Sequence, residues 1–298
     1  ISCDYTKGAA ENAKIVIAQV NKYMPRTLGD SFIHLSEMDY IVAYDEPILQ
    51  LVPPKIGEIE QKIGEYCASL IQDGDTLQLG IGAIPDAVLT FLKDKRHLGI
   101  HSEMISDGVV DLILAGVIDN SKKTIHKNKC VVSFLMGSPK LYDFVNNNPA
   151  VELYPVDYVN HPMIIAKNDN MISINSALQV DLMGQVNAES IGAKQFSGTG
   201  GQVDFVRGAS MSKGGKSIIA MPSTAAKGRI SKIVMNLDLG STVTTSRNDV
   251  DYVVTEYGIA SLKGKTLRER AKALIAIAHP DFRESLMKQA LEKFQILN

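Results

Sequence analysis

Short β-rich runs alternate with helical patterns through most of this 298-residue chain, and this alternation constrains the fold more than any other feature of the sequence. The β-rich runs lie at 76–82, 97–103, 129–135, 171–175, 217–221, 241–245 and 252–257. The helical patterns lie at 84–94, 107–116, 138–147, 266–278 and 281–294. Strands interleaved with helices predict βαβ crossovers, which place helices on both faces of a sheet. We therefore predict an α/β fold with an open, mostly parallel sheet.

The first part of the chain has a different character. Apolar residues at helical spacing predict an amphipathic helix over 9–24, which Pro25 ends. A strand is predicted at 39–45, and three prolines then lie in the extended stretch 46–56. This stretch is the best candidate for a domain boundary, and a further helix is predicted after it over 56–71.

The charge balance excludes several classes of partner. The 31 Lys and Arg residues nearly match the 33 Asp and Glu residues, so the chain presents no strong field to a nucleic-acid backbone or an acidic membrane. No apolar run approaches the roughly 18 residues of a membrane span. Three cysteines without a C-x-x-C pair indicate neither a disulfide framework nor a zinc site. We expect a cytoplasmic protein with no nucleic-acid partner, no membrane partner and no bound metal.

A glycine turn provides the first candidate binding segment. The sequence Gln-Leu-Gly-Ile-Gly-Ala-Ile-Pro at 78–85 lies between a predicted strand and a predicted helix. Glycine lets backbone N–H groups approach a ligand closely, and the amino end of a helix favours an anion. Gly80, Ile81 and Gly82 are therefore candidates for binding an anionic group. Glycines at such turns also serve tight packing, and the turn alone does not distinguish the two roles.

The second candidate segment is His-Ser-Glu-Met-Ile-Ser-Asp-Gly at 101–108, which begins where a predicted strand ends. Ligands bind at the carboxyl ends of strands in open α/β sheets. Glu103 is the candidate acidic group in this segment. A simpler alternative is that Glu103 only interacts with a helix dipole and that His101 has a structural role.

The third candidate is glycine-rich. Gly198, Gly200 and Gly201 lie within four positions, and a second predicted loop follows at 207–216. Such loops turn several backbone N–H groups toward an oxyanion or a phosphate. Lys213 and Lys216 add local positive charge to a chain that is otherwise balanced. The alternative is a pair of flexible surface loops without a ligand.

Taken in order, these three segments resemble the acetyl-CoA hydrolase/transferase family, and most closely its 4-hydroxybutyrate and butyryl-CoA:acetate CoA-transferases. Residues 25–34 and 277–283 extend the resemblance toward both ends of the chain. The resemblance implies two related α/β domains with the active site between them. It assigns residues 53–298 to the catalytic carboxyl-terminal domain, and residues 1–52 to the remnant of the amino-terminal domain and a linker.

The resemblance also implies a reaction. It places the family's catalytic glutamate at Glu103, where CoA would pass from an acyl-CoA to a short-chain carboxylic acid through a glutamyl-CoA thioester, with Gln78 as a polar neighbour. Coenzyme A enters as a thioester substrate, and no permanently bound cofactor is expected. The residues assigned to the oxyanion and to CoA are Gly80, Ile81, Gly82, Gly198, Gly200, Gly201, Lys213 and Lys216.

Several alternatives stay open at this point. An acyl-CoA hydrolase differs only in whether water reaches the intermediate, and a non-catalytic CoA-binding module would follow from an incomplete cleft. A homo-oligomer is also left open. Glu189 is the second choice for the catalytic carboxylate, although a surface loop position explains it more simply. The three cysteines are expected to be dispensable, with Cys67 in a buried apolar stripe.

Overall fold

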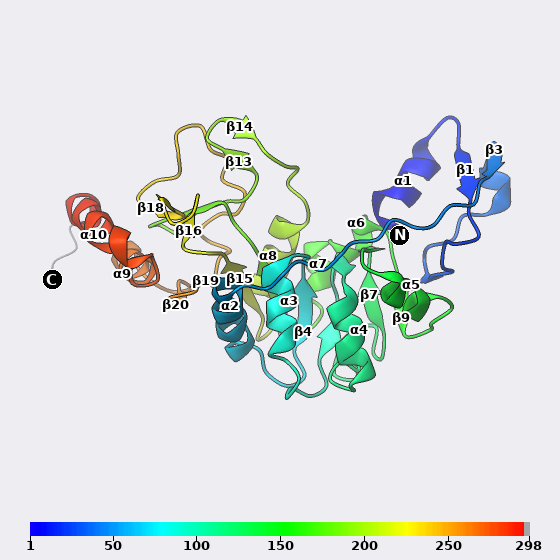
Figure 1. Cartoon of the computed structure of the whole chain (residues 1–298), viewed down its shortest axis with the longest axis horizontal. Coiled ribbons are helices and arrows are strands. Elements are labelled where there is room, and N and C mark those ends of the chain that lie inside the picture. Colours follow the sequence, from blue (N-terminus) through cyan, green and yellow to red (C-terminus); the bar gives the residue numbers. More distant parts are fainter. Residues whose placement is uncertain (295–298) are drawn as a thin grey trace.

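The computed structural model describes residues 1–294, and at its centre lies a six-stranded sheet with the strand order β20-β19-β15-β10-β4-β5 (Figure 1). Neighbouring strands run parallel except for β19 and β20. The strands are β4 (Thr76–Leu79), β5 (Gly99–Ile100), β10 (Met171–Asn175), β15 (Lys216–Ala220), β19 (Tyr252–Thr255) and β20 (Gly258–Ser261). The predicted α/β class with an open, mostly parallel sheet is confirmed.

Helices cover both faces of this sheet. The helices are α1 (Asp4–Asn12), α2 (Glu58–Ser69), α3 (Ala83–Thr90), α4 (Asp107–Leu114), α5 (Pro139–Val145), α6 (Val156–Val159), α7 (Pro162–Ile165), α8 (Gln202–Met211), α9 (Leu267–Ala276) and α10 (Pro280–Phe294). Successive residues of a strand face opposite sides of a sheet. Ile218 of β15 packs in the same core as Ile63 of α2 and Val88 of α3, whereas Ile219 packs in a separate core with Val206 of α8. The sheet is therefore buried on both faces, which is why its strands are continuous apolar runs.

A second group of parallel strands continues the sheet beyond β5. These strands are β7 (Cys130–Val132), β9 (Val151–Leu153) and β2 (Leu28–Gly29), with the shorter pair β6 (Met104–Ile105) and β8 (Phe134–Leu135) beside them. A parallel bridge between His101 and Val131 joins β5 to β7. The carboxyl ends of β4, β5 and β7 consequently meet along one edge, which is where an open α/β sheet binds ligands.

Small β pairings connect the larger elements between residues 179 and 234. They comprise β11 (Gln179–Asp181), β12 (Val186–Asn187), β13 (Ser190–Ile191), β14 (Lys194–Gln195), β16 (Thr224–Ala225), β17 (Ile230–Ser231) and β18 (Ile233–Val234). The strand predicted at 241–245 is wrong, because Thr245 forms only an isolated bridge with Val186. The second predicted loop, at 207–216, is also wrong over much of its length, since α8 extends to Met211.

The amino-terminal part forms a small projection beside the sheet (Figure 1). The helix predicted over 9–24 is wrong: α1 ends at Asn12, and β1 (Ile17–Val20) then pairs in parallel with β3 (Tyr40–Ala43). This pairing favours the extended conformation of the β-branched residues in β1 over their weak helical periodicity. A single 3-10 turn, η1 (Leu35–Glu37), precedes β3. The predicted strand at 39–45 is confirmed.

An extended strap over residues 44–57 links this projection to α2. Two hydrogen bonds hold it to α5 and the turn before that helix: the Leu51 amide donates to the Gly137 carbonyl (3.0 Å), and the Tyr142 hydroxyl donates to the Leu49 carbonyl (2.8 Å). Most of the strap is exposed, with Leu49 at 90% exposure, but Ile48 packs against the main core and Leu51 and Ile56 are half-buried. In the part of the chain that the structure describes, no helix combines the length and apolar character needed to cross a membrane.

Candidate active site

Glu103 lies immediately beyond β5, at the edge where the carboxyl ends of β4, β5 and β7 meet. The backbone on both sides of it is fixed. The Ser102 hydroxyl donates to the Leu79 carbonyl (3.1 Å) and accepts from the Leu79 amide (3.3 Å) at the end of β4. The Glu103 carbonyl accepts from the amides of Ser133 (2.9 Å) and Phe134 (3.0 Å) beyond β7. The residue is therefore held between two parallel strands on a rigid part of the sheet.

The Glu103 carboxylate faces two hydrogen-bond donors. Asn160 donates from Nδ2 to Oε2 at 2.9 Å, and the backbone of Gly201 lies directly against the same carboxylate, where its amide favours the charged form. Burial raises the pKa of Glu103 above its ordinary value, and the negative charges of Asp4 and Asp204 raise it further. The hydrogen bonds from Asn160 and Gly201 lower it. The site thus combines a half-buried carboxylate with donors that stabilise its charged form.

Gly201 brings the amino end of α8 directly against this carboxylate. It precedes the first residue of the helix and follows Gly200, whose φ of +57° suits glycine. A Cβ added to Gly201 would collide with the Glu103 carboxylate and the Asn160 amide, whereas one added to Gly198 or Gly200 would meet no atom within 4 Å. Close approach of backbone to the carboxylate therefore requires glycine at position 201. The helix dipole adds positive potential at the same point.

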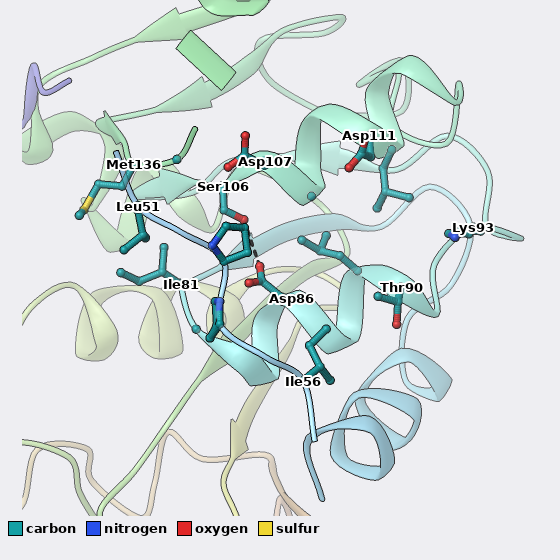
Figure 2. A pocket seen from close by; sticks show the side chains of 17 residues that line it. Leu51, Ile56, Ile81, Asp86, Thr90, Lys93, Ser106, Asp107, Asp111 and Met136 are labelled. Carbon is teal, nitrogen blue, oxygen red and sulfur yellow. Dashed lines mark hydrogen bonds between the residues drawn. The ribbon is translucent and has the colours of Figure 1, made fainter. Parts of the chain in front are cut away.

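The Gly80–Gly82 turn separates two hollows at the carboxyl edge of the sheet. One, of about 340 Å³, lies over the ends of β4, β10 and β15 and is lined by Gly80, Ile81, Asn175 and Ala220 among others. The other, of about 330 Å³, lies between α3, α4 and the strap, as Figure 2 shows. Ile81 and Gly82 line both hollows. The turn is therefore in a position to contact a ligand on either side.

The hollow in Figure 2 is mostly apolar, with a few polar side chains along α3 and α4. Leu51 and Ile56 of the strap form one wall, together with two prolines. Asp86 of α3 accepts a hydrogen bond from the Ser106 hydroxyl at 3.3 Å, and burial raises the pKa of Asp86. An apolar hollow with polar side chains along one side can hold an organic ligand and orient it.

Two domain models of one protein family match this chain. A family model for the acetyl-CoA hydrolase/transferase C-terminal domain matches residues 137–290, and the model for the N-terminal domain matches residues 1–53. The chain belongs to the acetyl-CoA hydrolase/transferase family. The resemblance inferred from the three segments is confirmed.

Relatives within the acetyl-CoA hydrolase/transferase family carry CoA-transferase names. The 4-hydroxybutyrate coenzyme A transferase of Clostridium kluyveri is 71% identical over 99% of this chain and 68% of its own length. The crystal structure of 4-hydroxybutyrate CoA-transferase from Porphyromonas gingivalis has a TM-score of 0.89 at 55% identity, covering 99% of this chain and 70% of that one. An acetyl-CoA hydrolase from Candida glabrata is more distant, at 30% identity over 70% of this chain and 39% of its own length. The chain spans about two thirds of the length of these two CoA-transferases.

The structure brings together only part of the site that the family resemblance implied. Gln78 is buried beside the edge, but its amide forms a reciprocal pair with Asn175 (3.1 and 3.2 Å) and no recorded hydrogen bond joins it to Glu103 within residues 1–294. Gly198 and Gly200 lie on the exposed loop that leads to Gly201. Of the third segment, Gly201 is the residue in contact with the carboxylate.

The structure does not bring Lys213 and Lys216 to this site. Lys216 begins β15 and donates from Nζ to the Leu70 carbonyl (2.8 Å), and Lys213 lies 4.0 Å from Asp169, just before β10. Both are near the amino ends of the strands: Lys216 is about 13 Å from the carboxyl end of β15 at the usual rise per residue, and Lys213 lies before that strand. The sequence analysis placed both lysines at the site because they follow the glycine loop closely. It did not recognise α8, which lies between the loop and the lysines.

Asn160 is the functional residue that the sequence analysis missed. It follows the one-turn helix α6 and is buried, with 7% of its surface exposed. Its neighbours in the sequence, Asn-His-Pro at 160–162, indicate a turn and give no sign of contact with residue 103. Only the fold brings these residues together across 57 positions.

Two secondary expectations have different outcomes. Glu189 was expected on a surface loop, but it is buried beside the turn between β12 and β13, so that expectation is wrong. The three cysteines are all free and buried, and Cys67 lies in the apolar core as predicted. Burial raises the pKa of the Cys67 thiol to about 12, which disfavours the nucleophilic thiolate.

Proposed function

We propose that this chain supplies the nucleophilic carboxylate of a CoA-transferase that moves CoA between an acyl-CoA and a short-chain carboxylic acid. The observation that carries the proposal is the arrangement at Glu103: a half-buried carboxylate that accepts a hydrogen bond from Asn160 Nδ2 and packs against the Gly201 backbone at the amino end of α8. The names of the family relatives support the same class of reaction.

The proposed reaction uses two displacements at carbonyl carbons. A Glu103 carboxylate oxygen attacks the thioester carbonyl, the C–S bond breaks, and the electron pair leaves with the CoA thiolate, giving a mixed anhydride. The thiolate then attacks the Glu103 side-chain carbonyl and releases the acyl group as a carboxylate. This leaves a glutamyl-CoA thioester. The acceptor acid repeats both steps in reverse, so that each bond broken is matched by one formed.

The two donors at Glu103 serve a specific step in this scheme. While one carboxylate oxygen acts as the nucleophile, Oε2 stays within reach of Asn160 and Gly201. When the thiolate attacks the side-chain carbonyl, negative charge develops on that retained oxygen. Donors already in place stabilise such an oxyanion without reorganisation. Asn160 and Gly201 therefore act as an oxyanion hole for the enzyme's own glutamyl group.

The Gly80–Gly82 turn is proposed to contact the substrate beside Glu103. Its residues line both hollows, and the Ser102 hydroxyl ties the end of β4 to the segment that carries Glu103. Exposed backbone donors at Ile81 and Gly82 suit the thioester carbonyl. We leave Lys213 and Lys216 out of the proposed CoA site because they lie at the other end of the strands.

The proposal also covers the cofactor, the domain organisation, the location and the oligomeric state. Coenzyme A is a thioester substrate, and no permanently bound cofactor is proposed. The division into residues 1–52 and 53–298 is kept, with the active site completed by residues from an amino-terminal domain. A cytoplasmic location and homo-oligomer formation are likewise proposals, the first supported by three free thiols.

The decisive experiment measures covalent CoA on Glu103. The chain is incubated with butyryl-CoA, both alone and joined to the amino-terminal third of the C. kluyveri relative, and its peptides are analysed by mass spectrometry. We expect a CoA adduct at Glu103 in the joined protein and its loss in Glu103→Gln, with transfer falling on the order of a thousandfold or more.

Three results would point elsewhere. CoA binding without an adduct in a folded joined protein would favour a binding module. An adduct on another residue would remove Glu103 from the mechanism. An adduct that passes its acyl or CoA group to water faster than to acetate would favour a hydrolase.

A further inference from the structure

His101 is completely buried two residues before the proposed nucleophile. The chain bends at Glu103 just beyond β5, and the side chains of His101 and Glu103 both contact the same neighbouring segment. That segment is the end of α6. His101 Nε2 lies 2.9 Å from the Val159 carbonyl, and Glu103 Oε2 lies 2.9 Å from Nδ2 of the next residue, Asn160.

The contact with Val159 fixes the tautomer of His101. A carbonyl oxygen only accepts, so Nε2 carries the proton and donates it. Burial lowers the pKa of His101 to about 3, so the ring is neutral under ordinary conditions and Nδ1 carries no proton. Nδ1 is buried and has no hydrogen-bond partner among residues 1–294. A single hydrogen bond therefore connects this imidazole to the polar groups around it.

The accepting carbonyl is one that a short helix cannot satisfy itself. The last carbonyls of a helix lack intrahelical donors, and α6 has a single turn. The bond from His101 therefore satisfies this carbonyl at the point where the turn ends. Asn160 follows directly, its backbone amide donates to the Val156 carbonyl (2.8 Å), and its side chain packs against Gly201. Within the described residues, Asn160 Nδ2 has one hydrogen-bond partner, Glu103, and the buried Oδ1 has none.

We propose that His101 is a positioning residue for the reaction at Glu103: its Nε2–H holds the Val159 carbonyl so that the adjacent Asn160 amide reaches Oε2. This inference rests on the proposed function only for the role of Glu103. His101, Glu103, Val159 and Asn160 form a closed arrangement, in which the segment after β5 supplies both the nucleophile and the donor that positions its hydrogen-bond partner.

The charged groups around this arrangement come from several elements. Asp4 of α1 and Asp204 of α8 face Glu103, and Lys123 and His126 face His101. Within the described residues, Lys123 donates to the Ile100 and Lys129 carbonyls and His126 lies against the Tyr158 hydroxyl, so neither donates to the Val159 carbonyl. A change at His101 consequently reaches Glu103 through the 159–160 segment and not through a change of charge, since the imidazole is neutral.

The test is the ionisation of Glu103, followed by ¹³C NMR of glutamate side chains in the 298-residue chain and assigned with Glu103→Gln. The His101→Asn side chain is too short to place its amide where Nε2 lies, whereas the His101→Gln amide reaches that position. In His101→Asn we expect the Glu103 titration midpoint to rise by roughly one pH unit, as in Asn160→Ala, because the stabilising donor is lost. In His101→Gln we expect it near the wild-type value. His97→Asn, at an exposed histidine paired with Asp119, is the control and should leave it unchanged.

The double variant His101→Asn with Asn160→Ala should show no rise beyond that of Asn160→Ala alone. A second measurement leaves His101 unchanged and follows the exchange of its Nε2–H proton with solvent. In Asn160→Ala, this exchange should be at least several-fold faster than in the wild type. Equal midpoints in folded His101→Asn and wild type would overturn the proposal, as would unchanged exchange in Asn160→Ala. Neither readout needs catalysis, so failure here is distinguishable from failure of the adduct experiment.

Discussion

The carboxyl edge of the sheet and the amino-terminal projection use side chains in opposite ways. At the edge, polar groups are buried and held: Asn160 is 7% exposed, and Glu103 is fixed through both its backbone and its carboxylate. In the projection, apolar groups are exposed, with Ile17 at 67% and Tyr40 at 62%. Burying polar groups costs free energy, and so does exposing apolar ones. Each region therefore has an arrangement that folding alone does not favour. The buried polar groups at the edge indicate a reactive site, and the exposed apolar groups of the projection indicate contact with another surface.

The comparison predicts that substitutions at the two regions have separable effects. Changes at the edge should alter the reaction and leave association unchanged. Changes in the projection should do the reverse. The following three predictions test that separation, from the largest expected effect to the smallest.

Gly201→Ala should have the largest effect of these three. Gly201 has φ of −87°, which alanine adopts freely, so the penalty comes from the collision of its methyl group with Glu103 and Asn160. Displacement of a reacting group by about 1 Å can cost roughly a hundredfold in rate. We expect a loss of this order in adduct formation, measured by rapid quench and mass spectrometry of the joined protein.

Gly198→Ala is the matched control for this prediction. It lies on the same loop, and a Cβ there meets no atom within 4 Å. Its rate should stay within about twofold of wild type. Equal losses in the two variants would mean that loop flexibility, and not contact with the carboxylate, explains the glycines.

The pH dependence of adduct formation should show the second largest effect. The nucleophile is the carboxylate, so the rate falls as pH falls through the Glu103 pKa, by roughly tenfold per unit below the midpoint. Burial raises that pKa, so the midpoint should lie above the ordinary value for glutamate. Asp204→Asn removes a negative charge that raises it, and the midpoint should move down. Asp249→Asn, at an acid paired with Arg207, is the control. An upward movement in Asp204→Asn would contradict the electrostatic account.

The smallest effect concerns association. Ile17 and Val42 lie on the same face of the β1–β3 pair, because Ile17 pairs with Tyr40 and Val42 is two residues further along. Replacing both with lysine should reduce self-association at high concentration by a few fold in sedimentation velocity, since the exposed apolar face becomes charged. The Glu103 adduct should form at an unchanged rate. A slower adduct with unchanged association would break the proposed separation between the two regions.

The sequence predicted the central sheet because its strands and helices carry strong and mutually consistent patterns. Apolar runs such as 171–175 became buried strands, and Asp107 to Leu114 became α4. The errors lie where pairing or packing decided the local structure. Residues 17–20 have β-branched side chains at a spacing that also fits a helix, and their parallel partner at 40–43 determines the outcome.

The candidate site was predictable only as far as local motifs extend. Glu103 and Gly201 belong to compact segments, and the structure brings them together. Asn160 and the bond from His101 to Val159 depend on contacts across 57 and 58 positions, which no local pattern encodes. Helix α8 lies between two glycine-rich stretches, at 198–201 and 214–215. These flanking glycines indicated loops on both sides, which concealed the helix and led to the wrong placement of Lys213 and Lys216.

The strap makes one wall of the hollow in Figure 2 easier to change by substitution than the sheet is. Leu51, Pro53, Pro54 and Ile56 form one wall, yet they belong to neither helix nor strand and are held mainly through backbone bonds at Leu49 and Leu51. Backbone bonds of this kind are indifferent to the side chain that carries them. Loop segments also accept substitution and changes in length more readily than the elements they connect. Related chains can therefore diverge in the shape of this hollow through a handful of strap residues, while the strand ends that hold Glu103 stay the same.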